Sequence, residues 1–227
     1  MSDRLQLRLS RPRPWWQAVW DFIGAPCRLL LFDQAWLPRF GWSTLEEDRL
    51  RAVLPHVAGQ VLDVGCGPNT LVRAHGRGVG VDVHDWGGGG LGVADTSRLP
   101  FEPDSFDTIT MVACLNHIPY RQAALIEARR LIKPDGRLIV TMIGPVTGGV
   151  GHALWWYSED KKRGGMVEGE VGGLANREVI RLCRAAGFEL SLHRRFEYGL
   201  NNLFVFVPGA VKPEPARSGP AREAPDA

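Results

Sequence analysis

The chain has 227 residues, of which 44% are hydrophobic and 23% are charged, as expected for one soluble globular domain with appended segments. Its net charge of +2 argues against a protein that binds nucleic acid mainly through charge. The cysteines show no CxxC spacing, so we expect neither a zinc site nor a disulfide framework, and no other metal site is predicted. They are Cys27, Cys66, Cys114 and Cys183.

Residues 1–42 form a tryptophan-rich segment that we expect to be an N-terminal helical cap or lid. Charged residues and a proline interrupt its apolar run 15–37, whereas a spanning helix needs about 20 mostly apolar residues. Two alternatives stay open. The segment packs over the following domain, or it lies on a membrane surface with its aromatic side chains in the interface and its arginines near the headgroups.

The beginning of the chain, Met1-Ser2-Asp3-Arg4, lacks the basic and apolar regions of a secretory leader. We therefore expect a cytoplasmic protein, either free or attached at a membrane surface. The sequence does not indicate an oligomeric state.

The next elements alternate between helix and strand. The residues Ser43-Thr44-Leu45-Glu46 are typical of a capping box and predict a helix that ends near Leu54. A strand at 60–64, a short helix at 69–75 and a strand at 79–83 follow. A run of four glycines at 87–90 then predicts a loop.

The middle of the chain continues this alternation. We expect a brief strand at 91–94, a strand at 106–112 and a helix over Tyr120–Ile132, whose apolar residues share one face. Lys133-Pro134-Asp135-Gly136 predicts a turn, after which a strand extends over 137–143.

The last third begins with an irregular stretch, 144–173. A helix with Asn176 as its cap and Gly187 as its stop follows, and then two strands at 188–196 and 203–207. From Pro208 onward, prolines, charges and alanines predict a disordered tail, 208–227.

These elements predict the fold class α/β. We expect a doubly wound, Rossmann-like, seven-stranded and mostly parallel sheet within residues 43–207. The final two strands have no helix between them, so they should form a C-terminal antiparallel hairpin at one edge.

The most informative run is Val61-Leu62-Asp63-Val64-Gly65-Cys66-Gly67, which predicts a buried strand followed by a glycine-rich turn. Glycines let a backbone approach a ligand closely at the carboxyl end of a parallel strand, where open α/β sheets bind cofactors. The next strand ends in Asp82, a carboxylate placed to bind two ribose hydroxyls. Together they predict an adenosine-containing cofactor.

The spacing of the glycines helps to choose that cofactor. A nicotinamide site needs G-x-G-x-x-G/A, but here Gly65 and Gly67 are followed by Thr70, and the fingerprint does not explain Asp63. A cofactor with a free amino acid does explain it, because Asp63 would lie near the ammonium group and the turn near the carboxylate. S-adenosylmethionine carries that group together with ribose and adenine.

Segment 61–143 resembles the class I, Rossmann-like S-adenosylmethionine-dependent methyltransferases, in particular the methyltransferase type 11 group. The resemblance consists of five short motifs in order. They are Asp63-Val64-Gly65-Cys66-Gly67, Gly80-Val81-Asp82-Val83, Ala94-Asp95-Thr96-Ser97-Arg98-Leu99-Pro100-Phe101, Asp104-Ser105-Phe106-Asp107 and Leu131-Ile132-Lys133-Pro134-Asp135-Gly136-Arg137-Leu138.

The resemblance implies a methyltransferase that uses S-adenosylmethionine, and it assigns a set of cofactor-binding positions. These are Asp63, Gly65, Cys66, Gly67, Asp82, Val83, Asp95, Thr96 and Cys114. Simpler interpretations are plain turn glycines at 65 and 67, a solvated strand end at Asp82, a loop cap at Asp95 and a small buried packing residue at Cys66.

The chain departs from the family pattern in two places. The third glycine of the first motif is Asn69, a residue that can adopt left-handed geometry at modest cost. Only 12 residues separate Asp82 from Asp95, and the glycine run takes the place of the usual helix there.

The methyl acceptor is less defined. His117, just past the fourth strand, is a candidate base or acceptor-positioning residue, with a structural histidine as the alternative; His152, Tyr157 and Glu170 are weaker candidates. Trp155 and its neighbours in stretch 144–173 form either an aromatic lid or an ordinary insertion. These aromatic residues indicate an aromatic or lipid-like small molecule.

Other functions are less well supported. Residues 113–116 are Ala-Cys-Leu-Asn and not the (N/D)-P-P-(Y/F/W) motif of nucleic-acid amino-methyltransferases, so no nucleic-acid partner is expected. A methyltransferase-like domain that binds without catalysis stays open. An NAD(P)-dependent oxidoreductase is disfavoured by Asp63 and Thr70.

Overall fold

The structure is a computed structural model that describes residues 9, 12–31, 36–145 and 168–210. Four aromatic or histidine residues of the predicted irregular stretch lie outside these ranges, as does most of the predicted tail. The four are His152, Trp155, Trp156 and Tyr157.

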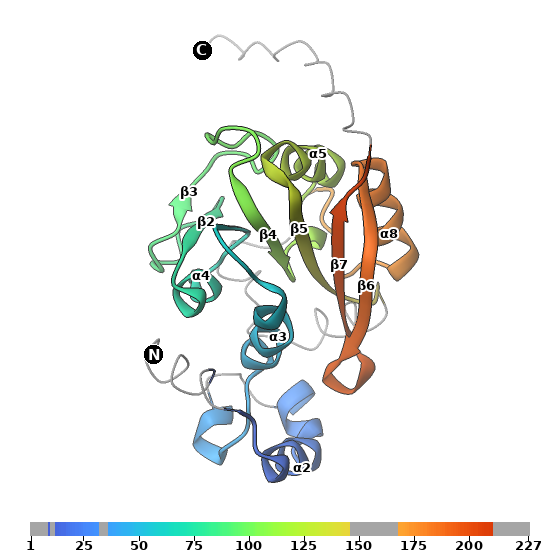
Figure 1. The fold of residues 1–227 in the computed structure, drawn as a ribbon. Coiled ribbons are helices and arrows are strands. Elements are labelled where there is room, and N and C mark those ends of the chain that lie inside the picture. The colour runs from blue at the N-terminus through green and yellow to red at the C-terminus, as the bar shows by residue number, and fades with distance from the viewer. Residues whose placement is uncertain (1–8, 10–11, 32–35, 146–167, 211–227) are drawn as a thin grey trace, which may run out of the picture.

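A seven-stranded sheet forms the centre of the molecule (Figure 1). Its strand order is β3-β2-β1-β4-β5-β7-β6. The first five strands are mutually parallel, and β7 pairs antiparallel with both β5 and β6. The strands are β1 (Val61–Val64), β2 (Gly78–Asp82), β3 (Leu91–Gly92), β4 (Phe106–Val112), β5 (Ile132–Ile143), β6 (Phe188–Phe196) and β7 (Asn201–Pro208). The predicted fold class, including the C-terminal antiparallel hairpin, is confirmed.

Helices cover both faces of this sheet. The α-helices are α2 (Trp15–Ile23), α3 (Leu45–Val53), α4 (Thr70–His75), α5 (Arg121–Leu131) and α8 (Asn176–Ala185). Short π- or 3₁₀-helical turns are η1 (Cys27–Leu31), η2 (Leu37–Phe40), η3 (Leu54–His56), η4 (Leu115–His117) and η5 (Glu197–Gly199).

Two hydrophobic cores result from the alternation of side chains along the strands. Leu138 and Val140 face the core formed with α5 and α8, whereas Ile139 between them faces the core formed with α3 and α4. Because both faces are buried, the central strands consist of nearly continuous apolar residues, as is usual in parallel sheets.

The connection between β2 and β3 is unusually short. Residues 83–90 must cross between two parallel strands, a step that ordinarily takes about a dozen residues or more. The glycine run makes this possible by packing against the turn after β1. A Cβ atom at Gly88 would lie 2.3 Å from the carbonyl oxygen of Pro68, and one at Gly90 would lie 2.7 Å from the sulfur of Cys66. The predicted loop is confirmed, and β3 is shorter than expected.

The predicted capping box before α3 is wrong by one position. The cap is Thr44, whose hydroxyl accepts a hydrogen bond from the amide of Glu47 at 3.1 Å. Ser43 is buried instead, and both its amide and its hydroxyl donate to Asp21. A tertiary partner therefore removes Ser43 from the local pattern.

Two further local predictions differ from the structure. Asn176 is the first residue of α8 and does not cap it. Its side-chain amide nitrogen donates a hydrogen bond to the side-chain oxygen of Asn202 on β7. The residues of the expected turn at 133–136 are instead part of β5, which begins at Ile132. The pairing of β5 with β4 is irregular here, because its register shifts between Phe106 and Thr108 of β4. Lys133 donates to Asp107 at 2.6 Å across this irregularity.

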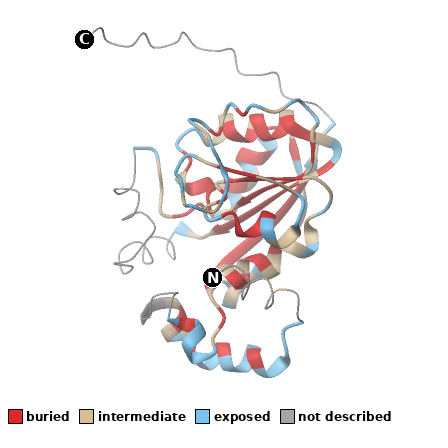
Figure 2. Ribbon diagram, turned by 90° about the vertical axis from the view of Figure 1, so that its left-hand side faces the viewer, coloured by how far each residue is buried: buried red, intermediate tan, exposed pale blue. Residues whose placement is uncertain are grey.

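Helix α2 lies at the lower end of the molecule in Figure 1, beyond α3 and near the connection between β6 and β7. Figure 2 shows it to be mostly exposed, apart from two buried positions, Gln17 and Asp21. Among the described residues, no helix is long and apolar enough to cross a membrane.

The close packing of Gly88 on Pro68 leads to a stability prediction. Gly88→Ala should lower the free energy of unfolding by about 1–3 kcal/mol, because the new methyl group overlaps backbone atoms that cannot move independently. Gly92→Ala is the matched control, since a Cβ there meets nothing within 4 Å. Denaturant unfolding of both variants tests this; equal stabilities would show that the loop does not pack closely on the turn.

Candidate active site

Asp63 is a buried carboxyl group on β1. Its side chain accepts a hydrogen bond from the Thr110 hydroxyl at 2.6 Å, and Thr110 lies opposite it in register on β4. Burial raises the pKa of Asp63 to about 7, although the Thr110 hydrogen bond acts in the other direction; the nearby charge of Asp82 raises it further. A cation placed beside Asp63 would therefore be stabilised strongly once the carboxyl ionises.

The turn after β1 passes very close to its neighbours. Gly65 and Gly67 have φ values of +70° and +51°, which favour glycine, and the amides of Gly65 and Cys66 both donate to the carbonyl oxygen of Val81 at 2.9 and 3.1 Å. A Cβ atom at position 65 would lie 2.5 Å from that of Cys114. No side chain fits there, so the backbone itself forms the floor of the site.

Asp82, at the end of β2, is oriented by two backbone amides. One carboxylate oxygen accepts from Gly67 at 2.9 Å and the other accepts from His84 at 3.0 Å. The carboxylate is partly exposed, and each of its oxygens can accept a second hydrogen bond. Val83 next to it has 60% of its surface exposed.

Asn69 has the left-handed backbone that the sequence led us to expect, with φ +57°. Its side-chain oxygen is buried and has no hydrogen-bond partner among the residues that the structure describes. It is the residue immediately before α4, directly after the glycine turn.

Asp95 is exposed and forms a loop cap. Its two carboxylate oxygens accept hydrogen bonds from the amide and the hydroxyl of Ser97, at 2.8 and 2.6 Å. Thr96 beside it is buried. These contacts match the simpler interpretation of Asp95, and its contact with adenine stays a prediction.

The two cysteines near the turn are packing residues. Burial raises the pKa of the Cys66 thiol to about 12, with Asp63 and Asp82 adding to the effect, and burial also raises the pKa of Cys114 well above its usual value. The Cys114 thiol donates to the carbonyl oxygen of Val64 at 2.9 Å. Thiols of this kind are poor nucleophiles, in agreement with the expectation for Cys66.

His117 is paired with Glu170. It ends η4, immediately after β4, and its Nδ1 lies 3.6 Å from a carboxylate oxygen of Glu170, whose side chain is almost fully buried. The segment around Glu170 is held in place, because Val171 and Asn116 exchange hydrogen bonds of 3.0 and 3.1 Å. Arg121 donates to the carbonyl oxygens of Asn116 and Gly169.

The structure thus brings together most of the predicted positions at the carboxyl edge of β1, β2 and β4. Sequence reasoning missed two residues, Thr110 and Arg121. Thr110 belongs to a predicted strand, but its register against β1 cannot be deduced from sequence. The pairing of His117 with Glu170 joins residues more than fifty positions apart and had no local signal.

Comparison with known proteins finds a methyltransferase domain in the middle of the chain. A family model described as "Methyltransferase domain" matches residues 62–140, the part of the chain that contains β1 to most of β5. The ubiquinone/menaquinone biosynthesis C-methyltransferase UbiE of Brucella abortus is 27% identical, in an alignment that covers 73% of this chain and 70% of that enzyme. Residues 62–140 therefore match a methyltransferase domain, and the chain is similar over most of its length to an S-adenosylmethionine-dependent C-methyltransferase.

Solved structures share the methyltransferase fold. A methyltransferase of Thermotoga maritima, described as a possible histamine N-methyltransferase, aligns with a TM-score of 0.56 at 19% identity and covers 71% of this chain and 88% of its own. A protein of Pyrococcus horikoshii aligns with a TM-score of 0.54 at 19% identity, over 81% and 95% of the two chains.

The residues at the edge of the methyltransferase sheet suit its methyl donor. The buried acid Asp63 matches a ligand ammonium group, the bare backbone at Gly65 permits close approach, and Asp82 offers lone pairs to two hydroxyls. Of the positions that the sequence singled out, Cys66 and Cys114 shape the floor beneath the turn, and Asp95 and Thr96 lie on the loop after β3.

The raised pKa of Asp63 predicts that donor binding is coupled to a proton. A bound ammonium group lowers this pKa, so at pH 6 binding of S-adenosylmethionine should release about one proton per site, and affinity should rise up to about tenfold per pH unit toward pH 7. Calorimetry in buffers of different ionisation enthalpy measures the release.

Asp63→Asn should abolish this proton release, and Asp135→Asn, at an exposed residue in the irregular part of β5, should retain it. Equal release by Asp63→Asn and the unaltered protein would show that another group titrates.

Proposed function

We propose that this methyltransferase transfers the methyl group of S-adenosylmethionine to a ring carbon of an aromatic, lipid-like acceptor of the quinol type. The observation that carries the proposal is the His117–Glu170 pair just after β4, three residues beyond the Cys114 that packs on the turn at Gly65. A phenolic acceptor has a proton that must be removed before its ring becomes a strong nucleophile, and this pair is built to remove it. The relationship to a C-methyltransferase of quinone biosynthesis supports the same acceptor class.

On the donor side, Asp63 is proposed to bind the ammonium group and the amides of the 65–67 turn to face the carboxylate. Asp82 would accept hydrogen bonds from the ribose hydroxyls, and Val83, Asp95 and Thr96 would surround the adenine. S-adenosylmethionine supplies an already activated methyl group, so the main contribution of these residues is alignment. Proximity and orientation can account for about 7–11 kcal/mol of barrier lowering.

On the acceptor side, His117 would accept the phenolic proton of the acceptor. The resulting phenolate pushes electron density onto the adjacent ring carbon, which forms the new carbon–carbon bond while the methyl–sulfur bond breaks. The proton displaced from that carbon then leaves to solvent and aromaticity is restored. Glu170 stabilises the imidazolium ion that forms during the reaction, because its carboxylate lies beside Nδ1 and is shielded from water.

A test of the base role is His117→Gln. It should reduce kcat with a soluble hydroquinone by about 100-fold or more, while affinity for S-adenosylmethionine changes by less than about twofold, because a general base acts on the chemical step. Glu170→Gln should reduce kcat by about tenfold, since it only loses charge stabilisation of the imidazolium.

His75→Gln is the control, because His75 contacts the carbonyl oxygen of Gly59 at the opposite end of the sheet. Mass spectrometry of the product distinguishes carbon from oxygen methylation. Full activity of His117→Gln would remove the base role. Binding of the donor without turnover of any phenol or quinol would favour a domain that binds the cofactor without this catalysis.

A further inference from the structure

Helix α2 is oriented with its polar residues inward. Seven of its nine residues are apolar, and the two polar ones, Gln17 and Asp21, are the two that are buried. They are spaced four residues apart, so they lie on one side of the helix. This is the reverse of an ordinary surface helix, which buries its apolar side.

A polar network holds the helix in this orientation. Arg28, which is 1% exposed, donates to Asp48 on α3, to the carbonyl oxygen of Ser43 at 2.9 Å and to the hydroxyl of Tyr198 at 2.7 Å. Asp21 accepts from both polar groups of Ser43 and forms an ion pair with Arg13.

The effect of this network is visible in the ionisation of Asp21. Burial alone would raise the pKa of Asp21, but the hydrogen bonds from Ser43 and Arg13 and the charge of Arg28 lower it below its usual value. The ionised network is therefore part of the folded structure and fixes which side of α2 faces outward.

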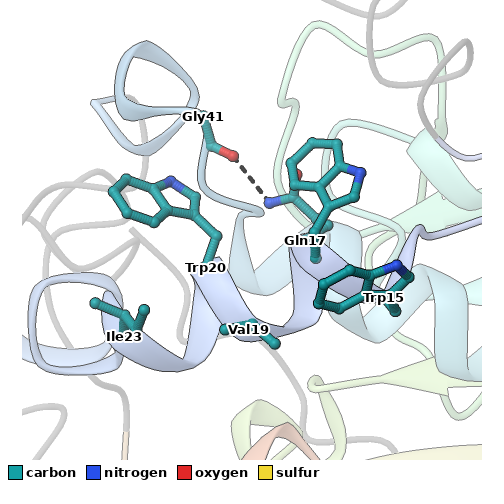
Figure 3. A pocket seen from close by; sticks show the side chains of 7 residues that line it. Trp15, Gln17, Val19, Trp20, Ile23 and Gly41 are labelled. Atoms are coloured by element: carbon teal, nitrogen blue, oxygen red, sulfur yellow. Dashed lines mark hydrogen bonds between the residues drawn. The ribbon is translucent and has the colours of Figure 1, made fainter.

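The outward side of α2 is aromatic and aliphatic. Trp15 is 79% exposed and Ile23 is 63% exposed. Further large exposed side chains on this helix are Trp16, Val19, Trp20 and Phe22. Figure 3 shows the Gln17 side chain donating to the carbonyl oxygen of Gly41, while Trp15, Val19 and Ile23 extend from the helix. These three side chains line a pocket of about 790 Å³.

The same part of the chain is basic and rich in tryptophan. Residues 1–42 contain six arginines and three aspartates, so they carry a net charge of +3, and they contain five of the eight tryptophans. Arg13 and Arg28 belong to the ion-paired network, whereas Arg39 is exposed. The guanidinium of Arg39 lies 4.3 Å from the centre of the Trp36 ring, another exposed residue. Tryptophan and arginine together are the residues that favour the headgroup region of an anionic bilayer.

We propose that α2 docks onto an anionic lipid surface with its Trp15–Ile23 aromatic side in the headgroup region. Tyr198, which receives the Arg28 hydrogen bond, lies in the connection between β6 and β7, next to the Asn201 that pairs with the last residue of β5. The Arg28–Tyr198 hydrogen bond therefore holds the docking surface near the carboxyl edge of the sheet, which is the edge where Asp63 and Asp82 lie. A lipid-like acceptor would then leave the bilayer near the site that methylates it.

The test is sedimentation of the full chain with phosphatidylcholine vesicles that contain or lack phosphatidylglycerol. The protein should bind the anionic vesicles, and higher salt should weaken binding. The triple variant Trp15→Ser, Trp16→Ser, Ile23→Ser should bind about tenfold or more weakly. It leaves Trp20 in place, because the Trp20 indole donates to the carbonyl oxygen of Phe40 and stacks on Trp42.

Tyr120→Ser is the matched control, since Tyr120 is 75% exposed at the beginning of α5 and should not affect binding. Circular dichroism checks that every variant is folded. Lipids brominated on their acyl chains should quench the tryptophan fluorescence of the unaltered protein and much less that of the triple variant.

Several outcomes would overturn the proposal. The first is absence of vesicle binding, and the second is vesicle binding by the triple variant as strong as that of the unaltered protein. The third is tryptophan fluorescence that acrylamide does not quench in the absence of lipid, which would mean that another part of the chain covers α2. A dimer that the triple substitution dissociates, without vesicle binding, would assign the surface to a second copy. Vesicle binding requires no methyl acceptor, so each of these results leaves the proposed methyl transfer untouched.

Discussion

Two hydrogen bonds to one carbonyl oxygen organise the active-site edge of this protein. The amides of Gly65 and Cys66 both donate to Val81 and so hold the turn after β1 against the end of β2. The Gly67 amide consequently reaches the Asp82 carboxylate, and position 65 is pressed so closely on Cys114 that only glycine fits. Three strand ends are thereby joined into one rigid floor, which is what a methyl transfer that depends on alignment requires.

Buried charge is used in two different ways in the molecule. The network of Asp21 and Asp48 with Arg13 and Arg28 balances two carboxylates with two guanidinium groups, so it stabilises one orientation of the N-terminal helix. Asp63 has a hydroxyl partner in Thr110, and its raised pKa shows that ionisation is costly there. A buried carboxyl group of this kind is poised to respond to a cationic ligand, whereas a neutralised network is not.

Much of the fold and of the donor side of the site could be predicted from local sequence. The run of alternating elements indicated a parallel sheet, and Asp63, the turn glycines and Asp82 lie where the motif order led us to expect. The two caps that were predicted wrongly, Ser43 and Asn176, are cases in which a residue with local capping ability binds a distant partner instead. The predicted turn at 133–136 was also wrong, because these residues extend β5. A single sequence contains no record of such partners.

Local chemistry by itself determined which segments form strands and turns, because glycine tolerance, apolar periodicity and strand-end carboxylates act over a few residues. The tertiary structure alone decided the pairing of His117 with Glu170, the register that joins Asp63 to Thr110 and the outward orientation of α2. The composition of α2 suggested an apolar helix, but the side that it buries depends on Arg28, Ser43 and their neighbours. Those contacts form only after the chain has folded, since they join residues that local propensity does not connect.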